Sequence, residues 1–105
     1  KKLGNIDWTK EAVSIERLIR GLNPWPSAYT MWNDKVMKIW AAEVVEVSGE
    51  EAPGTIVAVD KDSFTVQTGH QQLKVLELQI PGKKRMDAGA FLRGYQIKEM
   101  TKLGE

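Results

Sequence analysis

The sequence has 105 residues, which is the size of one ordinary domain with a single hydrophobic core. Hydrophobic residues make up 42% and charged residues 28%, a composition typical of a folded globular protein and unlike that of a disordered chain. Cysteine is absent and histidine occurs once, which excludes disulfides, thiol nucleophiles, cysteine metal sites and multi-histidine metal sites. No apolar run approaches the ~20 residues of a membrane helix, and the first residues do not read as a signal peptide, so we expect a cytoplasmic protein without a membrane partner.

Charge is distributed unevenly along the chain, although the formal net charge is only +1. Residues 1–40 contain seven Lys and Arg against four Asp and Glu, residues 41–80 contain two against seven, and residues 81–105 contain six against three. The chain therefore has basic ends and an acidic middle. If the fold brings the two ends together, the protein presents one basic face, which suits a polyanionic partner.

The first predicted element is a helix. Residues 1–5 have the composition of a linker remnant, and we place the domain at residues 6–105. The helix is predicted to begin after an N-cap at Thr9, to be capped by Gly21 and to stop before the prolines at positions 24 and 26. Its apolar residues recur at helical spacing and form one stripe: Ala12, Ile15, Ile19 and Leu22.

The rest of the chain has mostly the periodicity of strands, which we predict over residues 29–32, 36–47, 55–59, 64–68 and 73–78. The second is long for one strand, and a bulge near Ala41 and Ala42 would bend it between two parts of a curved sheet. After a basic loop at residues 81–85, Asp87 is the predicted N-cap of a short helix that Gly94 ends. The pattern predicts a mainly β fold: a small OB-like open barrel with an N-terminal helix and a short C-terminal helix.

Few residues of this sequence are suited to catalysis. His70 lies between Gly69 and glutamines in a predicted hairpin loop, without a neighbour that would orient it as a general base. The carboxylates of residues 43–51 are typical of a solvated acidic face, because Glu43 and Glu46 face opposite sides of an ideal strand. The sequence contains no phosphate-loop, nucleophile or metal motif. We therefore expect no catalytic residue and no metal site here, and any active centre in another part of a longer protein.

The strongest local charge signal is the run Lys83-Lys84-Arg85, which is typical of either a solvated loop or a loop that contacts phosphates. Basic residues of the first segment favour the second alternative if the fold brings them to the same side; they include Lys1, Lys2, Arg20 and Lys38.

Aromatic rings could add platforms on which bases stack. Most of the rings lie within apolar runs or beside prolines, so we predict that they pack in the core or against the helix. Tyr95 is the expected exception.

Several blocks of the sequence carry a resemblance to a known family. In chain order they are Ile6-Asp7-Trp8, Leu18-Ile19-Arg20-Gly21-Leu22-Asn23-Pro24-Trp25-Pro26, Pro53-Gly54-Thr55-Ile56, Leu76-Glu77-Leu78-Gln79, Pro81-Gly82-Lys83-Lys84-Arg85-Met86 and Phe91-Leu92-Arg93-Gly94. Together they closely resemble the C-terminal domain of bacterial methionyl-tRNA formyltransferases. Each block alone is a weak signal, but the ordered set is highly specific.

The resemblance implies a role in translation initiation. Enzymes of this family transfer a formyl group from 10-formyltetrahydrofolate to the methionine on initiator tRNA, using an N-terminal catalytic domain that this chain lacks. The chain is then expected to bind tRNA without catalysing the reaction or holding a cofactor, as a monomeric domain whose partners are initiator tRNA and the catalytic domain. The resemblance and the charge pattern assign phosphate contacts to Lys1, Lys2, Arg20, Lys38, Lys83, Lys84 and Arg85.

Two observations leave alternatives open. The loop after Thr68-Gly69 usually continues in this family with an acidic residue and a glycine, whereas this chain has His70-Gln71-Gln72. Related formyltransferases that act on small substrates such as sugar nucleotides share a similar domain, which would then have a structural role. A free-standing single-strand binder is a third interpretation.

Overall fold

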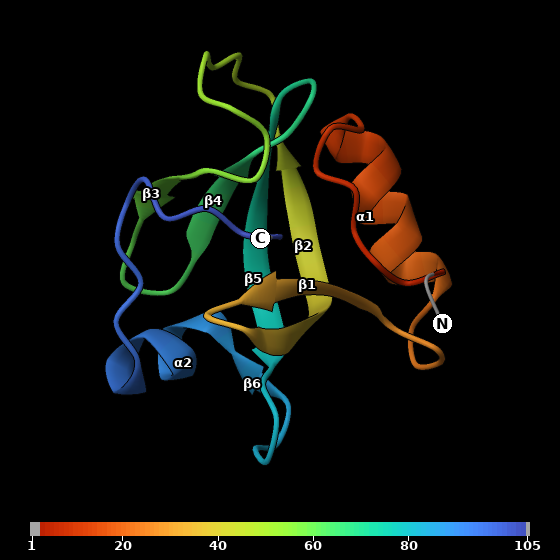
Figure 1. The fold of residues 1–105 in the computed structure, drawn as a ribbon, viewed down its shortest axis with the longest axis vertical. Coiled ribbons are helices and arrows are strands. Elements are labelled where there is room, and N and C mark those ends of the chain that lie inside the picture. Colours follow the sequence, from red (N-terminus) through yellow and green to blue (C-terminus); the bar gives the residue numbers. More distant parts are fainter. Residues whose placement is uncertain (1–2, 105) are drawn as a thin grey trace.

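A computed structural model describes residues 3–104 and shows a curved antiparallel sheet flanked by two helices (Figure 1). The elements in chain order are α1 (Ala12–Gly21), β1 (Ala28–Trp32), β2 (Lys35–Val45), β3 (Ile56–Val59), β4 (Phe64–Gln67), β5 (Gln72–Gln79), β6 (Met86–Asp87) and α2 (Ala88–Gly94). The strand order is β1-β2-β5-β4-β3, with β6 paired to β5. Within the described residues β1 and β3 do not pair with each other, so the barrel is open. The predicted mainly β fold with two helices is confirmed.

The bend of the sheet lies in β2. Residues 35–39 of β2 pair with β1, and residues 38–45 pair with β5. The register with β5 shifts between Ile39 and Ala41 and again between Ala41 and Ala42. Such irregularities kink a strand and increase its twist, so one strand can serve two parts of a curved sheet. The predicted bulge is confirmed.

Alternation along β2 separates the core from the outer surface. Met37 and Ile39 are almost completely buried, whereas Lys38 is exposed and Trp40 is half-buried. The same core includes the largest fully buried side chains of the other strands and of α2: Phe64, Leu73, Leu78, Val66, Val75, Ile56 and Phe91. The outer face of β2 is therefore left with a cation and an indole ring.

The prediction that Tyr95 is an exposed ring is wrong. Its ring stacks on Phe91 with centroids 5.0 Å apart and meets the edge of Trp32 at 6.1 Å. The reason is that Tyr95 is extended directly after α2, which turns its ring back over the ring of Phe91 one turn earlier. Trp25 is instead the ring most exposed to solvent among the large hydrophobic side chains, at 84%.

α1 lies beside β2 and turns its predicted apolar stripe toward the sheet, with Ala12, Ile15 and Ile19 buried. Its N-cap is Glu11 rather than Thr9. Thr9 is occupied elsewhere, because its hydroxyl and amide both donate to the Asp7 carboxylate at 2.6 and 3.0 Å.

The C-terminal cap of α1 also differs from the prediction. Leu22 is the capping residue, and its amide donates to the carbonyl of Leu18 at 3.0 Å. Gly21 lies within the helix and is not in the left-handed conformation. The helix ends because the chain turns into the Asn23–Pro26 segment, not because of a glycine cap.

α2 begins as predicted. The Asp87 carboxylate accepts a hydrogen bond from the Ala90 amide at 2.8 Å, which makes Asp87 the N-cap. The two-residue strand β6, which precedes α2, was not predicted, because two residues carry no periodicity. Its pairing with β5 joins Leu78 to Met86 and Glu77 to Asp87.

Backbone from outside the named strands pairs with one residue in each of β1 and β3, the outer strands of the sheet. Tyr29 in β1 exchanges hydrogen bonds with residues 4 and 6 at 2.8 Å each. Ile56 in β3 exchanges hydrogen bonds with residues 100 and 101 at 2.7 and 2.8 Å. Leu103 is buried and its amide donates to Gly54, so the segment that follows α2 closes over the opening of the sheet.

Candidate nucleic-acid interface

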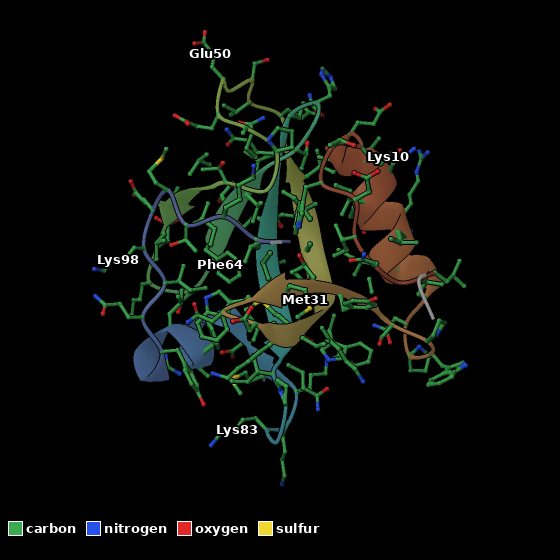
Figure 2. All side chains as sticks on the ribbon, in the orientation of Figure 1. Lys10, Met31, Glu50, Phe64, Lys83 and Lys98 are labelled. Atoms are coloured by element: carbon green, nitrogen blue, oxygen red, sulfur yellow. The ribbon has the colours of Figure 1, made fainter. Side chains whose placement is uncertain are left out.

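The basic loop and the acidic loop lie at opposite ends of the long axis of the molecule, as the labels of Lys83 and Glu50 show (Figure 2). The molecule extends 34 × 29 × 22 Å. The basic end is the connection between β5 and β6, in which Lys83, Lys84 and Arg85 are all exposed. The acidic end is the loop of residues 48–53, with Glu50 and Glu51 exposed. The fold thus keeps these carboxylates away from the surface that carries the basic run.

The shape of the basic loop is set by backbone and amide contacts. β5 and β6 pair at the base of the loop. Within it, Gly82 adopts the left-handed conformation, with φ of 78°. The Lys83 amide donates to the Ile80 carbonyl at 3.2 Å, and the Gln79 side-chain amide donates to the Lys83 carbonyl at 2.9 Å. The lysines are therefore presented on a turn that is held from both sides.

Trp40 supports this loop from the outer face of β2. Its indole Nε1 donates to Gln79 Oε1 at 3.1 Å, so Gln79 joins the ring to the loop. The Arg85 guanidinium carbon lies 5.0 Å from the ring centroid and Lys38 Nζ lies 5.9 Å from it. Both distances are in the range of cation–π contacts. Two cations that are 47 residues apart in sequence therefore share one aromatic platform.

Arg85 also forms an ion pair. Its Nη2 and Nε atoms lie 2.6 and 2.7 Å from Oε1 of Glu77, and the two side chains are 47% and 40% exposed. Within residues 3–104 no ion pair involves Lys83 or Lys84. The three adjacent cations thus differ: Arg85 is neutralised locally, whereas the two lysines project from the loop.

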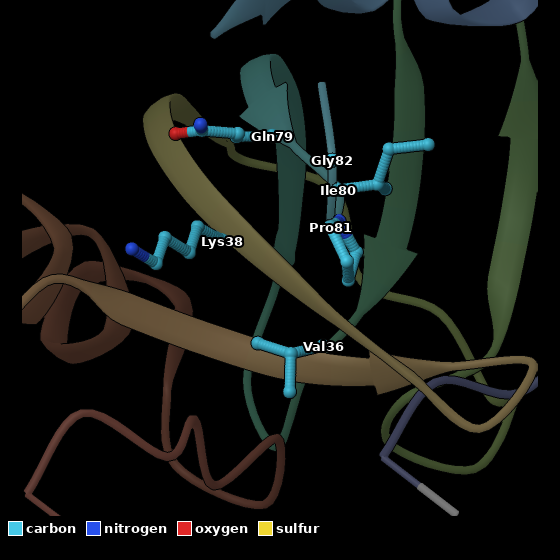
Figure 3. Close-up of a pocket in the computed structure, with 6 residues that line it drawn as sticks. All are labelled: Val36, Lys38, Gln79, Ile80, Pro81 and Gly82. Carbon is cyan, nitrogen blue, oxygen red and sulfur yellow. The ribbon is translucent and has the colours of Figure 1, made fainter. Parts of the chain in front are cut away.

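A shallow depression of about 290 Å³ lies between β2 and the loop (Figure 3). Its lining comprises Val36, Lys38, Gln79, Ile80, Pro81 and Gly82. Figure 3 shows the polar ends of Lys38 and Gln79 directed to the same side, away from Ile80. Such an open surface with a cation at its rim suits contact with a polymer backbone better than enclosure of a small substrate.

For the remaining predicted cations, Arg20, Lys1 and Lys2, no contact with the basic loop is described. Arg20, near the end of α1, is 67% exposed and its Nε lies 2.7 Å from Glu16 Oε2. Asn23, three residues after Arg20, contacts β2: its side-chain amide donates to the Trp40 carbonyl at 3.4 Å. Lys1 and Lys2 lie outside the described residues. The structure therefore brings Lys38 to the basic loop and leaves Arg20 on α1.

Sequence reasoning missed Trp40, Gln79 and Glu77 as parts of this surface. The signal for Trp40 was the alternation on β2, since a core residue at Ile39 requires both of its neighbours to face outward. The signal for Glu77 and Gln79 was weaker, because it depends on the pairing of β5 with the unpredicted β6. Five of the eight aromatic rings pack in the core, as predicted for most of them: Trp8, Trp32, Phe64 and Phe91 are buried, and Tyr95 packs against them.

Other chemistry has little support in the part of the chain that is described. His70 is exposed in its loop, as predicted, and its carbonyl accepts a hydrogen bond from the Ala12 amide at 3.0 Å. Among residues 3–104 no three acidic or histidine side chains come together as a metal site would require. Neither helix in that range is long and apolar enough to span a membrane.

Comparison with known proteins identifies the family. The family model described as "Formyl transferase, C-terminal domain" matches residues 1–96. The chain belongs to this family. This formyl transferase C-terminal domain is 57% identical over 99 residues to a methionyl-tRNA formyltransferase of Agathobacter rectalis, a match that covers 94% of the chain and 32% of that relative. It is 51% identical to a methionyl-tRNA formyltransferase of Lachnospira eligens, with 100% of the chain and 35% of the relative covered. The domain thus spans about a third of the length of these relatives.

Solved structures support the fold. A variant of HypX from Aquifex aeolicus superposes with a TM-score of 0.63 at 17% identity, over 84% of this chain and 16% of that one. A second HypX variant superposes with a TM-score of 0.62 at 18% identity, over 90% and 18%. At such identities the likeness concerns the fold alone, so the formyl transferase C-terminal domain shares its architecture with these chains and nothing more is inferred from them.

Proposed function

We propose that this domain binds the phosphate backbone of tRNA for a parent enzyme that formylates the methionine of initiator tRNA. The observation that carries the proposal is the exposed pair Lys83 and Lys84, held on a fixed turn at the end of the molecule opposite the acidic loop. Lys38 adds a third cation beside that turn. The relatives named above supply the substrate class, since both are methionyl-tRNA formyltransferases.

The proposed division of labour follows from the chemistry of the surface. Lysines that contact phosphates give affinity and orientation but read little sequence. We therefore assign recognition of the initiator tRNA, the formyl donor 10-formyltetrahydrofolate and the catalytic residues to the N-terminal part of the parent enzyme, and none of them to this chain. A parent enzyme with these partners acts where translation begins, in the cytoplasm. The names of the relatives do not favour the alternative of a small sugar-nucleotide substrate.

The experiment measures binding of this chain to an initiator tRNA and to an elongator tRNA at several salt concentrations. The test variant is the double change Lys83→Ala with Lys84→Ala. The matched control is Lys61→Ala with Lys98→Ala, which removes the same charge from exposed positions on other parts of the surface. Each phosphate contact contributes roughly 0.7–0.9 to the slope of log affinity against log salt.

We expect the two tRNAs to bind alike, because the contacts are to the backbone. Between ~50 and ~200 mM salt the wild type should lose roughly tenfold more affinity than the Lys83/Lys84 variant, which lacks two phosphate contacts. The control variant should keep the wild-type slope. Equal slopes for the wild type and the Lys83/Lys84 variant would refute the assignment of phosphate contacts to these lysines, and no tRNA binding even at low salt would favour a structural role for the domain.

A further inference from the structure

Among residues 3–104, the carboxylate of Glu77 forms an ion pair with Arg85, one of the cations of the proposed RNA surface. Oε1 of Glu77 accepts a hydrogen bond from Nε of Arg85 at 2.7 Å, and Nη2 lies 2.6 Å from the same oxygen, so one edge of the guanidinium faces the carboxylate. The guanidinium carbon lies over the ring of Trp40, 5.0 Å from its centroid. Arg85 thus has both an acidic and an aromatic partner, and the acidic partner reduces the positive charge that it presents.

This ion pair contributes little to the stability of the fold. Both partners are substantially exposed, and exposed ion pairs contribute little to folding because solvent screens them and two long side chains must be ordered. The loop is held by other groups: the pairing of β5 with β6, and the bond from Gln79 to the Lys83 carbonyl. Glu77 can therefore be replaced without loss of the fold, so that its effect on binding can be measured.

We propose that Glu77 is a specificity-determining residue that lowers the affinity of this surface for RNA by neutralising Arg85. The inference rests on the function proposed above and adds a negative determinant to it. A phosphate at the unused edge of Arg85 would lie close enough to the Glu77 carboxylate to be repelled. Glu77 would therefore weaken non-specific binding to polyanions. Productive binding would require phosphates that also contact Lys83 and Lys84.

The test is a double-mutant cycle on this chain with Glu77→Gln and Arg85→Ala, read by tRNA affinity and its salt dependence. Glutamine keeps the shape and one acceptor oxygen of Glu77 but not the charge. The matched control is Glu50→Gln, which removes an equal charge from the opposite end of the molecule (Figure 2).

Glu77→Gln should bind tRNA roughly threefold more tightly near ~150 mM salt, as expected when one carboxylate within about 7 Å of a phosphate is removed. Its salt slope should be steeper by up to about 0.9, because Arg85 then neutralises one more phosphate. In the Arg85→Ala background the change of slope should vanish, and Glu50→Gln should alter affinity less than twofold. The melting temperature of Glu77→Gln should stay within about 3 °C of the wild type, since the exposed pair contributes little.

Each of the following results would overturn the inference. Unchanged or weaker binding by Glu77→Gln would show that the carboxylate positions Arg85 rather than opposing RNA. An equal gain in the Arg85→Ala background, or in Glu50→Gln, would show an effect of net charge only. A wild type that binds no tRNA would refute the proposed function as well, whereas a wild type that binds through Lys83 and Lys84 without a gain on Glu77→Gln refutes this inference alone.

Discussion

Gln71 has a backbone conformation that suits glycine better than the residue present. Its φ is 68°, in the left-handed region that favours glycine. The contacts of the residue are made by its backbone: its carbonyl accepts from the Thr68 hydroxyl at 2.8 Å and from the Gln67 side-chain amide at 3.1 Å. Replacing the side chain therefore leaves those hydrogen bonds in place, and Gln71→Gly should stabilise the domain.

The magnitude follows from two opposing terms. A residue with a Cβ in the left-handed conformation costs roughly 1–2 kcal/mol. Replacement by glycine removes that cost. It also destabilises the fold by about 0.5–1 kcal/mol, because glycine loses more conformational freedom on folding. The net stabilisation at Gln71 is then roughly 0.5–1 kcal/mol, which for a domain of this size corresponds to a rise in melting temperature of roughly 2–8 °C.

The assay is thermal and urea unfolding followed by tryptophan fluorescence, with Gln71→Ala as the matched control. Alanine removes the same functional group but keeps the Cβ, so its stability should not exceed that of the wild type. If Gln71→Gly and Gln71→Ala have equal melting temperatures, the left-handed backbone is not a source of strain and the reasoning is refuted.

Two further predictions concern the helices and the turn before α1. Asp87→Ala should destabilise the domain by about 1 kcal/mol in urea unfolding, because the N-cap bond to Ala90 is lost, whereas Asp87→Asn should keep most of the stability; equal losses in the two variants would argue against a capping role. The hydroxyl of Thr9, and then its amide, donate to the Asp7 carboxylate and hold the pKa of Asp7 below its usual value. A lowered folded-state pKa means that the carboxylate stabilises the fold at neutral pH and that this contribution is lost as pH falls below about 4 and through the folded pKa. Melting temperatures recorded from pH 7 to pH 2 should therefore fall less steeply for Asp7→Asn than for the wild type, and parallel curves would contradict the assignment.

The strands and helices were largely predictable because their residues carry strong periodic signals. The stripe of α1 and the alternation of β2 both reflect burial on one side, and burial is what decides these elements. The caps of α1 were predicted wrongly for a local reason: Thr9 has a nearer acceptor in Asp7, and Gly21 fits inside a helix without needing a left-handed turn. Competing local contacts of this kind are not visible in periodicity.

The candidate site was predictable only in part. The run Lys83-Lys84-Arg85 identified the loop, since charge can be read directly from the sequence. The sequence did not predict that Arg85 would have an acidic partner whereas the two lysines project from the loop. Glu77 contacts Arg85 only because β5 pairs with a two-residue strand. The meeting of Lys38 with Arg85 at Trp40 likewise depends on the neighbouring positions of β2 and β5 in the sheet.

The covering of both outer strands has a consequence for how copies of this domain behave at high concentration. Bare edge strands offer rows of N–H and C=O groups on which another chain can add a strand, and this is a common start of β-aggregation. Here residues 4 and 6 bond to Tyr29 of β1, and residues 100 and 101 bond to Ile56 of β3, so part of each edge is covered. An open barrel thereby reduces the hazard that a closed barrel avoids by having no edge. These contacts shorten the bare edge on which a second copy of the domain could add a strand.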